Sequence, residues 1–192
     1  MTIDSAFIEF PRLSTERLLL RQVQLSDKEA LFSIRSDPEV RAAYGTDPTA
    51  SPEITLKWIR ELIRNYAERK AIFWCITFKD DPRAIGSCTL WNMELESFRA
   101  ELGYELNRSH WRMGIMYEAL TAVLSWCFDE MELNRIEACP LDRNVASKEL
   151  LRRLGFRFEG DLKERIRFHD RFEDQLYFRL LKSEWLFTRK ES

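Results

Sequence analysis

The stretch from Tyr104 to Ala119 joins a strand-like run to a long amphipathic helix through a polar turn and a single glycine, Gly114. A chain that passes from a strand into a helix in this way places the first amides of the helix at the turn. Those N–H groups have no partner inside the helix, and the helix dipole favours negative charge beside them. The stretch therefore predicts a strand–turn–helix unit with an anion site, for which a phosphate or pyrophosphate is the natural ligand.

The chain before this unit carries signals for one strand and two helices. Residues 17–24 are typical of a first strand. Ser26-Asp-Lys-Glu29 has the form of a capping box and predicts a helix through Arg35, which Asp37-Pro38 ends. Ser51-Pro52-Glu53 predicts a second helix with proline at its first position. The apolar residues of that helix recur at helical spacing: Trp58, Ile59, Leu62, Ile63 and Tyr66.

The pattern then changes to three strands, which we expect at 71–78, 84–91 and 99–106. The long helix follows from about 113 to 130, and a short strand from 135 to 139.

The remaining signals lie near the end of the chain. Asn144 is a helix cap, and Gly155 is a left-handed stop for the same helix. Two final strands are expected, from Arg157 onward and from Asp174 to Leu181. The order β-α-α-β-β-β-α-β-α-β-β predicts an α/β or α+β fold in which helices flank one sheet.

Composition limits the class of protein. With 192 residues, the chain is expected to form a single domain, with a core at about 13–185. The net charge of −2 disfavours a nucleic-acid partner. No apolar run is long enough for a membrane helix. Four cysteines without a Cys-x-x-Cys pair, and only two histidines, predict no metal site and no disulfide framework, and favour a cytoplasmic protein.

Several short motifs, taken in order, resemble the GNAT acetyltransferases of the RimJ/RimL-like branch. The resemblance covers roughly residues 13–185. The motifs that carry it are Leu13-Ser-Thr-Glu-Arg-Leu-Leu-Leu-Arg21, Asp37-Pro-Glu-Val40, Ile85-Gly86, Gly103-Tyr104, Trp111 with Gly114, Glu118-Ala119, Asn144-Val-Ala-Ser147, Leu154-Gly-Phe156, Glu159-Gly160 and Glu184-Trp185.

The resemblance implies a mixed central sheet of about seven strands, with a splay between the fourth strand (99–106) and the fifth. It also implies acetyl-CoA as the co-substrate, with its pantetheine arm in the splay and its pyrophosphate on the amides of the helix start. Mapped onto this chain, the cofactor-binding residues would be Leu106, Arg112, Met113, Gly114, Ile115, Met116 and Asn144. Arg112 stands where the branch often has glycine, and Met116 replaces a small residue.

Two residues of the second cofactor motif have candidate roles. Asn144 either bonds the pantetheine or serves only as a helix cap, and both roles are compatible. The tyrosine that usually acts as the superfamily's acid is absent, because Leu151 holds its position. The resemblance therefore makes Ser147 the candidate that returns a proton to the CoA thiolate, and the alternative is a plain first-turn serine.

The general base must be a group that takes a proton from an incoming ammonium, and a carboxylate is the usual solution. Glu101 and Glu105 share one face of the fourth strand. The resemblance makes Glu101 the first choice and Glu164 the second. Each of the three carboxylates could instead be an ordinary surface or ion-paired group.

Other conspicuous residues receive simpler interpretations. Trp111 is expected to pack the loop, and His110 to be a turn residue. Trp58, Trp74 and Trp91 belong either to the core or to the wall of the acceptor cleft. Cys139 lies near the expected thioester, but direct transfer is favoured over an acyl-cysteine.

The predicted activity is acetyl transfer from acetyl-CoA to a primary amine, either a protein N-terminus or a small molecule. The loops at 36–57 and 165–174 would set acceptor specificity. A monomer or a homodimer is expected. The alternative is a non-catalytic acyl-CoA-binding or sensing module.

Overall fold

A computed structural model describes residues 6–94 and 96–185. Eight strands lie within these residues: β1 Leu13–Ser14, β2 Leu18–Gln22, β3 Ile72–Phe78, β4 Gly86–Glu94, β5 Arg99–Leu106, β6 Arg135–Ala138, β7 Arg157–Phe168 and β8 Arg171–Leu181. The α-helices are α1 Lys28–Arg35, α2 Pro38–Ala42, α3 Pro52–Ala67, α4 Ile115–Asp129 and α5 Val145–Arg153.

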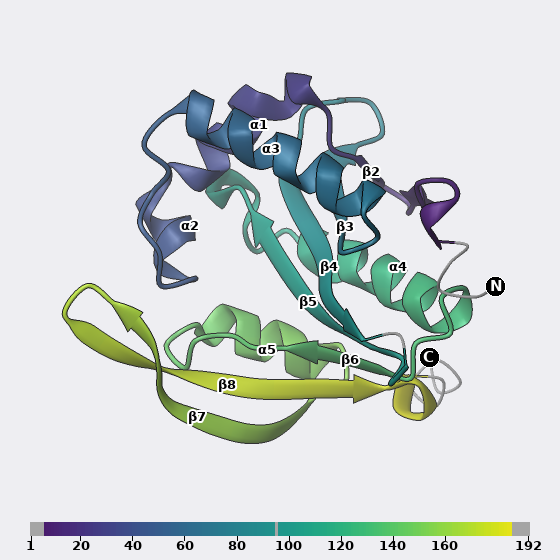
Figure 1. Ribbon diagram of the computed structural model, residues 1–192, viewed down its shortest axis with the longest axis vertical. Helices are drawn as coiled ribbons and strands as arrows, with labels where there is room; N and C mark the ends of the chain where they lie inside the picture. Colours follow the sequence, from purple (N-terminus) through teal and green to yellow (C-terminus); the bar gives the residue numbers. More distant parts are fainter. Residues whose placement is uncertain (1–5, 95, 186–192) are drawn as a thin grey trace.

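The strands form one sheet in the order β1-β2-β3-β4-β5-β6-β8-β7. Every neighbouring pair is antiparallel except β5 and β6. Helices α1 and α3 cover one face, and α4 and α5 cover the other (Figure 1). The predicted mixed α/β sheet with flanking helices is therefore confirmed, with eight strands where about seven were expected.

Both faces of β3 are buried, which explains its unbroken apolar sequence. Trp74 belongs to the larger core cluster with α4, whereas Phe73 and Cys75 belong to the smaller cluster with α1 and α3. A strand covered on both sides shows no alternation of polar residues. The site described below lies two strands away from this core, where the sheet opens.

The start of the first helix differs from the prediction. Asp27, rather than Ser26, organises it: its carboxylate accepts a hydrogen bond from the Gln24 backbone N at 2.8 Å. A 3-10 turn over Leu25–Asp27 precedes α1. The Ser26–Glu29 capping box was wrong because the box forms two residues earlier, between Gln24 and Asp27, and the Asp27 carboxylate also pairs with Arg21.

A helix also occurs where only a stop was expected. Asp37-Pro38 ends α1, as predicted, and then begins α2. The Asp37 carboxylate accepts a hydrogen bond from the Glu39 backbone N at 2.9 Å, and Pro38 takes the first helical position. One dipeptide therefore both stops a helix and starts the next.

Candidate active site

The sheet opens between β5 and β6. Their parallel pairing covers only residues 99–101 and 135–137. Beyond Ala138 the chain follows β8 instead: the Leu176 N donates to the Pro140 carbonyl at 2.9 Å, and Leu141 bridges Gln175. The second half of β5 keeps β4 on one side, and on the other it borders a cavity of about 880 Å³. The predicted splay between the fourth and fifth strands of the sequence, here β5 and β6, is confirmed.

One end of this cavity is formed by the N-terminus of α4. Gly114 caps the helix with a φ of 74°, and the first intrahelical bond runs from the Glu118 N to the Gly114 carbonyl at 3.1 Å. The earlier amides of the helix therefore point out of its end, where the helix dipole is positive. The side chains of Ile115 and Met116 are buried in the core, so these residues offer the cavity their backbone. This geometry supports the anion site predicted from the sequence.

Arg112 also has a left-handed backbone, with a φ of 61°. Residues with a side chain seldom adopt this conformation, whereas glycine adopts it freely. The structure therefore gives a physical reason for the glycine that the branch often has at this place.

A clamp from the start of the sheet holds this loop. The Arg17 guanidinium pairs with the Glu118 carboxylate at 2.7 Å and donates to the Met113 carbonyl at 3.2 Å. The Thr15 hydroxyl donates to the same carboxylate at 2.5 Å. Burial of Glu118 opposes its ionisation, but the bonds from Thr15 and Arg17 outweigh burial and lower its pKa. The clamp joins two sequence motifs, Thr15-Glu-Arg17 and Glu118-Ala119.

Replacing Gly114 with alanine is expected to destabilise the protein by about 1–2 kcal/mol, the cost of a left-handed backbone for a residue with a side chain. A Cβ at this position meets only the Arg17 guanidinium, at 3.7 Å, so the penalty comes from the backbone and not from a clash. Urea unfolding measures it.

Gly160→Ala is the matched control, because a Cβ there meets nothing within 4 Å. Equal unfolding midpoints for the two variants would contradict the left-handed conformation at Gly114.

A hydrogen-bonded cluster lies at the start of α5. The Asn144 side chain accepts a bond from the Ser147 N at 3.0 Å, which confirms its role as a cap, and it donates to the Ala43 carbonyl at 3.3 Å. The Ser147 hydroxyl lies 2.7 Å from the Tyr104 hydroxyl of β5. Burial raises the pKa of Tyr104, which keeps it protonated and able to donate. Sequence reasoning gave Tyr104 no role, although it noted the Gly103-Tyr104 motif.

Leu151, where the usual tyrosine acid is missing, is fully buried in the core. The hydroxyl beside Ser147 comes from Tyr104 of β5. It does not come from position 151 of α5, whose side chain is buried in the core.

The loop after α2 also borders the cavity. Its Tyr44 hydroxyl donates to the Tyr104 backbone carbonyl. Further along, Asp47 pairs with His169 of the β7–β8 hairpin at 3.0 Å. The structure thus brings together the two segments, 36–57 and 165–174, that were expected to set acceptor specificity.

The structure distinguishes the three candidate carboxylates. Glu105 is buried and paired with Arg41 at 3.3 Å and with Arg35 at 3.5 Å, so its charge is already neutralised. Glu164 is exposed on the hairpin and does not line the cavity; its backbone N donates to Asp174 at 2.9 Å. Glu101 is half-buried and lines the cavity beside the end of the β5–β6 pairing.

Burial raises the pKa of Glu101, and the charge of Glu137 adds to this effect, while a hydrogen bond with Asn92 opposes it. A carboxylate that is more basic than usual suits proton abstraction.

The sequence left open whether Trp58, Trp74 and Trp91 belong to the core or to the wall of the acceptor cleft, and the structure distinguishes them. Trp74 is fully buried, and its Nε1 donates to the Pro11 carbonyl at 2.7 Å. Trp58 packs against Phe73 and lies under the Arg35 guanidinium, 3.8 Å from the ring centroid. Trp91 is 46% exposed and lines the cavity.

Trp111, His110 and Cys139 also line the cavity. The Trp111 Nε1 donates to the Leu106 carbonyl at 2.9 Å, consistent with a loop-packing role. His110 is the last residue of a 3-10 turn over Arg108–His110 and packs on Phe78. Burial and the nearby Glu101 raise the pKa of the Cys139 thiol to about 12, so it is protonated at neutral pH and is a weak nucleophile.

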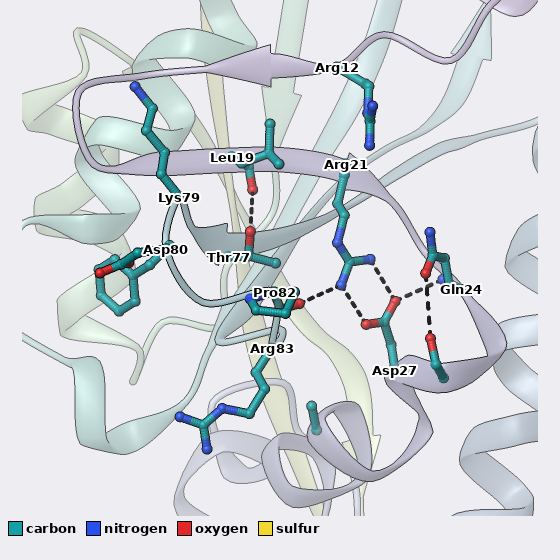
Figure 2. Close-up of a pocket in the computed structure, with 13 residues that line it drawn as sticks. Arg12, Leu19, Arg21, Gln24, Asp27, Thr77, Lys79, Asp80, Pro82 and Arg83 are labelled. Carbon is teal, nitrogen blue, oxygen red and sulfur yellow. Dashed lines mark hydrogen bonds and ion pairs between the residues drawn. The ribbon is translucent and has the colours of Figure 1, made fainter.

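A second hollow, of about 510 Å³, lies beside β2 and the β3–β4 turn (Figure 2). Its central charge is internally satisfied: Arg21 donates to Asp27 at 2.7 Å and to the Pro82 carbonyl at 2.7 Å (Figure 2). This buried pair fastens α1 to the sheet. Because Arg21 is already paired, its charge is not available to a ligand in this hollow.

Two further findings concern residues 6–94 and 96–185. No helix there is both long and apolar enough to cross a membrane. Within the same residues, no group of three or more His, Cys, Asp or Glu side chains is placed to hold a metal ion.

The sheet with one open parallel pair and a helix N-terminus at its opening matches a known class. Residues 17–157 match the acetyltransferase (GNAT) domain family. The chain belongs to this family and is an N-acetyltransferase.

Relatives and solved structures agree with this assignment. The chain is 37% identical to the N-acetyltransferase YoaA of Bacillus subtilis over 81% of this chain and 88% of that protein. It is 29% identical to the [ribosomal protein uS5]-alanine N-acetyltransferase of Escherichia coli over 91% and 92% of the two chains. A GNAT-family acetyltransferase structure from Bacillus anthracis superposes with a TM-score of 0.80 at 25% identity, covering 91% of this chain and all of that one.

Proposed function

We propose that the protein transfers an acetyl group directly from acetyl-CoA to a primary amine that enters from the Glu101 side of the splay. The observation that carries this proposal is a single cavity that runs from the N-terminus of α4 to the Glu101 carboxylate. The name of the Escherichia coli relative makes a protein N-terminus one acceptor class to test, and small amines are the other.

The residues present fit acetyl-CoA. The backbone amides of residues 112–116 would hold the pyrophosphate, as the outward-facing end of α4 allows. The open edge of β5 as far as Leu106, together with Asn144, would hold the pantetheine arm. When bound, acetyl-CoA supplies an activated acetyl group and a thiolate leaving group.

Three parts of the chain would then act on the reaction. Glu101 accepts a proton from the incoming ammonium, either directly or through water. Backbone N–H groups of the unpaired half of β5 donate hydrogen bonds to the thioester carbonyl oxygen. The Ser147 hydroxyl, held by Tyr104, donates a hydrogen bond to the sulfur as negative charge develops there.

Replacing Ser147 with alanine is expected to lower kcat roughly 10- to 100-fold, the range for losing a hydrogen bond to a charged group. Tyr104→Phe should cause a smaller loss, because it leaves the serine hydroxyl in place. Acetyl-CoA affinity, measured by calorimetry, should change little in Ser147→Ala. Ser26→Ala is the control, because Ser26 is exposed and lines the second hollow beside β2, not the cavity of the splay. A wild-type kcat in Ser147→Ala would contradict a role for the Ser147 hydroxyl in the reaction.

The proposed function itself is tested by acetyl-CoA binding, followed by thiol release against a panel of amines and N-terminal peptides. Acceptor-dependent release supports it. Tight binding without release from any acceptor would overturn it in favour of an acyl-CoA-binding or sensing module.

A further inference from the structure

Trp91 is an exposed aromatic side chain on the acceptor side of the cavity. It is 46% exposed and lies on β4, directly opposite Glu101 of β5. Residues in such a cross-strand position have their Cβ atoms about 4.5–5.5 Å apart. The indole is therefore a neighbour of the one candidate carboxylate that the structure places in the cavity without a neutralising arginine pair.

The indole leans along β5 toward the splay. A Cβ built on Gly103 would lie 4.0 Å from the Trp91 Nε1, so the ring reaches over this glycine. Gly103 is two residues beyond Glu101, where the β5–β6 pairing ends. The ring thus stands at the edge of the opening.

A β-bulge supports this placement. The register of β4 and β5 shifts between Trp91 and Glu94, and Asn92 has a left-handed φ of 49°. Bulges re-aim the neighbouring side chains and are common beside active sites. Here the bulge also brings the Asn92 side chain to the Glu101 carboxylate, with which it forms a hydrogen bond.

The Glu101 carboxylate is positioned to attract a cation, although the charges of Arg165 and Arg99 also act on it. Glu105 is paired with Arg41 and Arg35, which leaves Glu101 as the carboxylate next to the indole. An ammonium group is attracted both by a carboxylate and by the face of an indole ring, tryptophan being the best aromatic partner.

We propose that Trp91 and Glu101 together form the recognition site for the acceptor's protonated amine, with the ammonium and its first carbon against the indole face. This inference rests on the proposed function and deepens it by naming Trp91 as a specificity residue. Peptide N-termini and alkylamines share the ammonium chemistry, so the test includes both.

The test uses quaternary ammonium probes, which cannot be acetylated and so report binding alone. One probe is butyltrimethylammonium, and the other is a short peptide with a trimethylated N-terminal nitrogen. Each has an uncharged partner in which carbon replaces that nitrogen. Calorimetric titrations are made with the full chain, both free and saturated with CoA.

The wild type should bind at least one charged probe more tightly than its neutral partner. Trp91→Ala should weaken that binding roughly three- to tenfold, and Trp91→Phe should weaken it less. Phe98→Ala is the matched control, because Phe98 is 47% exposed and does not line the cavity. The probe that is preferred, peptide or alkyl, identifies the source of the amine.

Equal affinity for charged and neutral probes in the wild type, or unchanged affinity in Trp91→Ala, would overturn the inference. These results are separate from the activity assay. Trp91-dependent binding without thiol release would contradict the proposed function alone, whereas normal transfer with an unchanged amine KM in Trp91→Ala would contradict this inference alone.

Discussion

Glu101→Gln is expected to lower kcat by about 100-fold or more, the usual contribution of a positioned general base. The substitution preserves the size of the side chain and its ability to bond Asn92, but it removes the site that accepts the proton. Because Glu101 lies at the end of the cavity opposite to α4, acetyl-CoA affinity should stay close to that of the wild type. Single-turnover rates at saturating acetyl-CoA measure the effect.

The pH profile gives a second readout of the same residue. Burial and the charge of Glu137 raise the pKa of Glu101 above its ordinary value of 4.5. A base works only when ionised, so kcat/KM should fall as the pH drops through this raised pKa. The acid limb should therefore lie above pH 4.5, and it should flatten in Glu101→Gln.

Glu164→Gln is the control, since Glu164 is exposed and lies outside the cavity. Its kcat should stay within about twofold of wild type, as expected for a surface residue. A large loss in Glu164→Gln combined with a normal Glu101→Gln would reverse the assignment and make Glu164 the base.

Gly86→Ala is expected to destabilise the protein by about 3 kcal/mol, as severe overpacking does. A Cβ on Gly86 would lie 2.7 Å from the Glu105 carbonyl oxygen and 2.9 Å from the Leu106 Cδ1. The first contact is with backbone, which cannot rotate away, so β5 itself must shift. The shift would also displace the strand edge proposed to hold the pantetheine. Urea unfolding measures the stability, and calorimetry with acetyl-CoA measures the second effect.

Gly103→Ala separates the clash from a general effect of alanine in this part of the sheet. A Cβ on Gly103 would meet Thr89 at 3.8 Å and Trp91 at 4.0 Å, which are ordinary contacts. Its unfolding free energy should stay within about 1 kcal/mol of wild type. If Gly86→Ala unfolded at the wild-type midpoint, the close approach of β4 and β5 would be wrong.

The parts of the fold that sequence predicted correctly depend on local chemistry. Ser51-Pro52 starts α3, Gly114 starts α4, and Gly155 ends the α5 segment with a φ of 89°. Each signal acts within one helical turn, so neighbouring residues suffice to read it. The wrong capping box at Ser26 shows the limit: the box forms at Gln24 and Asp27 instead, and the Asp27 carboxylate is also held by Arg21 of β2, a contact that the local pattern does not show.

The site was harder to predict because its contacts are long-range. Nothing in the sequence around Glu101 and Glu105 distinguishes two glutamates on one strand face; the arginines that neutralise Glu105 come from α1 and α2. The bond between Tyr104 and Ser147 likewise joins residues 43 positions apart. The motif resemblance named Ser147, but only the folded chain brings the tyrosine hydroxyl to it.

The short pairing of β5 and β6 has a consequence for solubility. An unpaired strand edge is a template on which other chains can add strands and aggregate. Here the free half of β5 lies inside the sheet rather than at its rim, and the Tyr44 hydroxyl already bonds the Tyr104 carbonyl on it. A second polypeptide strand cannot easily reach such a recessed edge, whereas a thin, flexible ligand arm can. At this position the fold can thus expose backbone groups for binding without offering other proteins a place to add a strand.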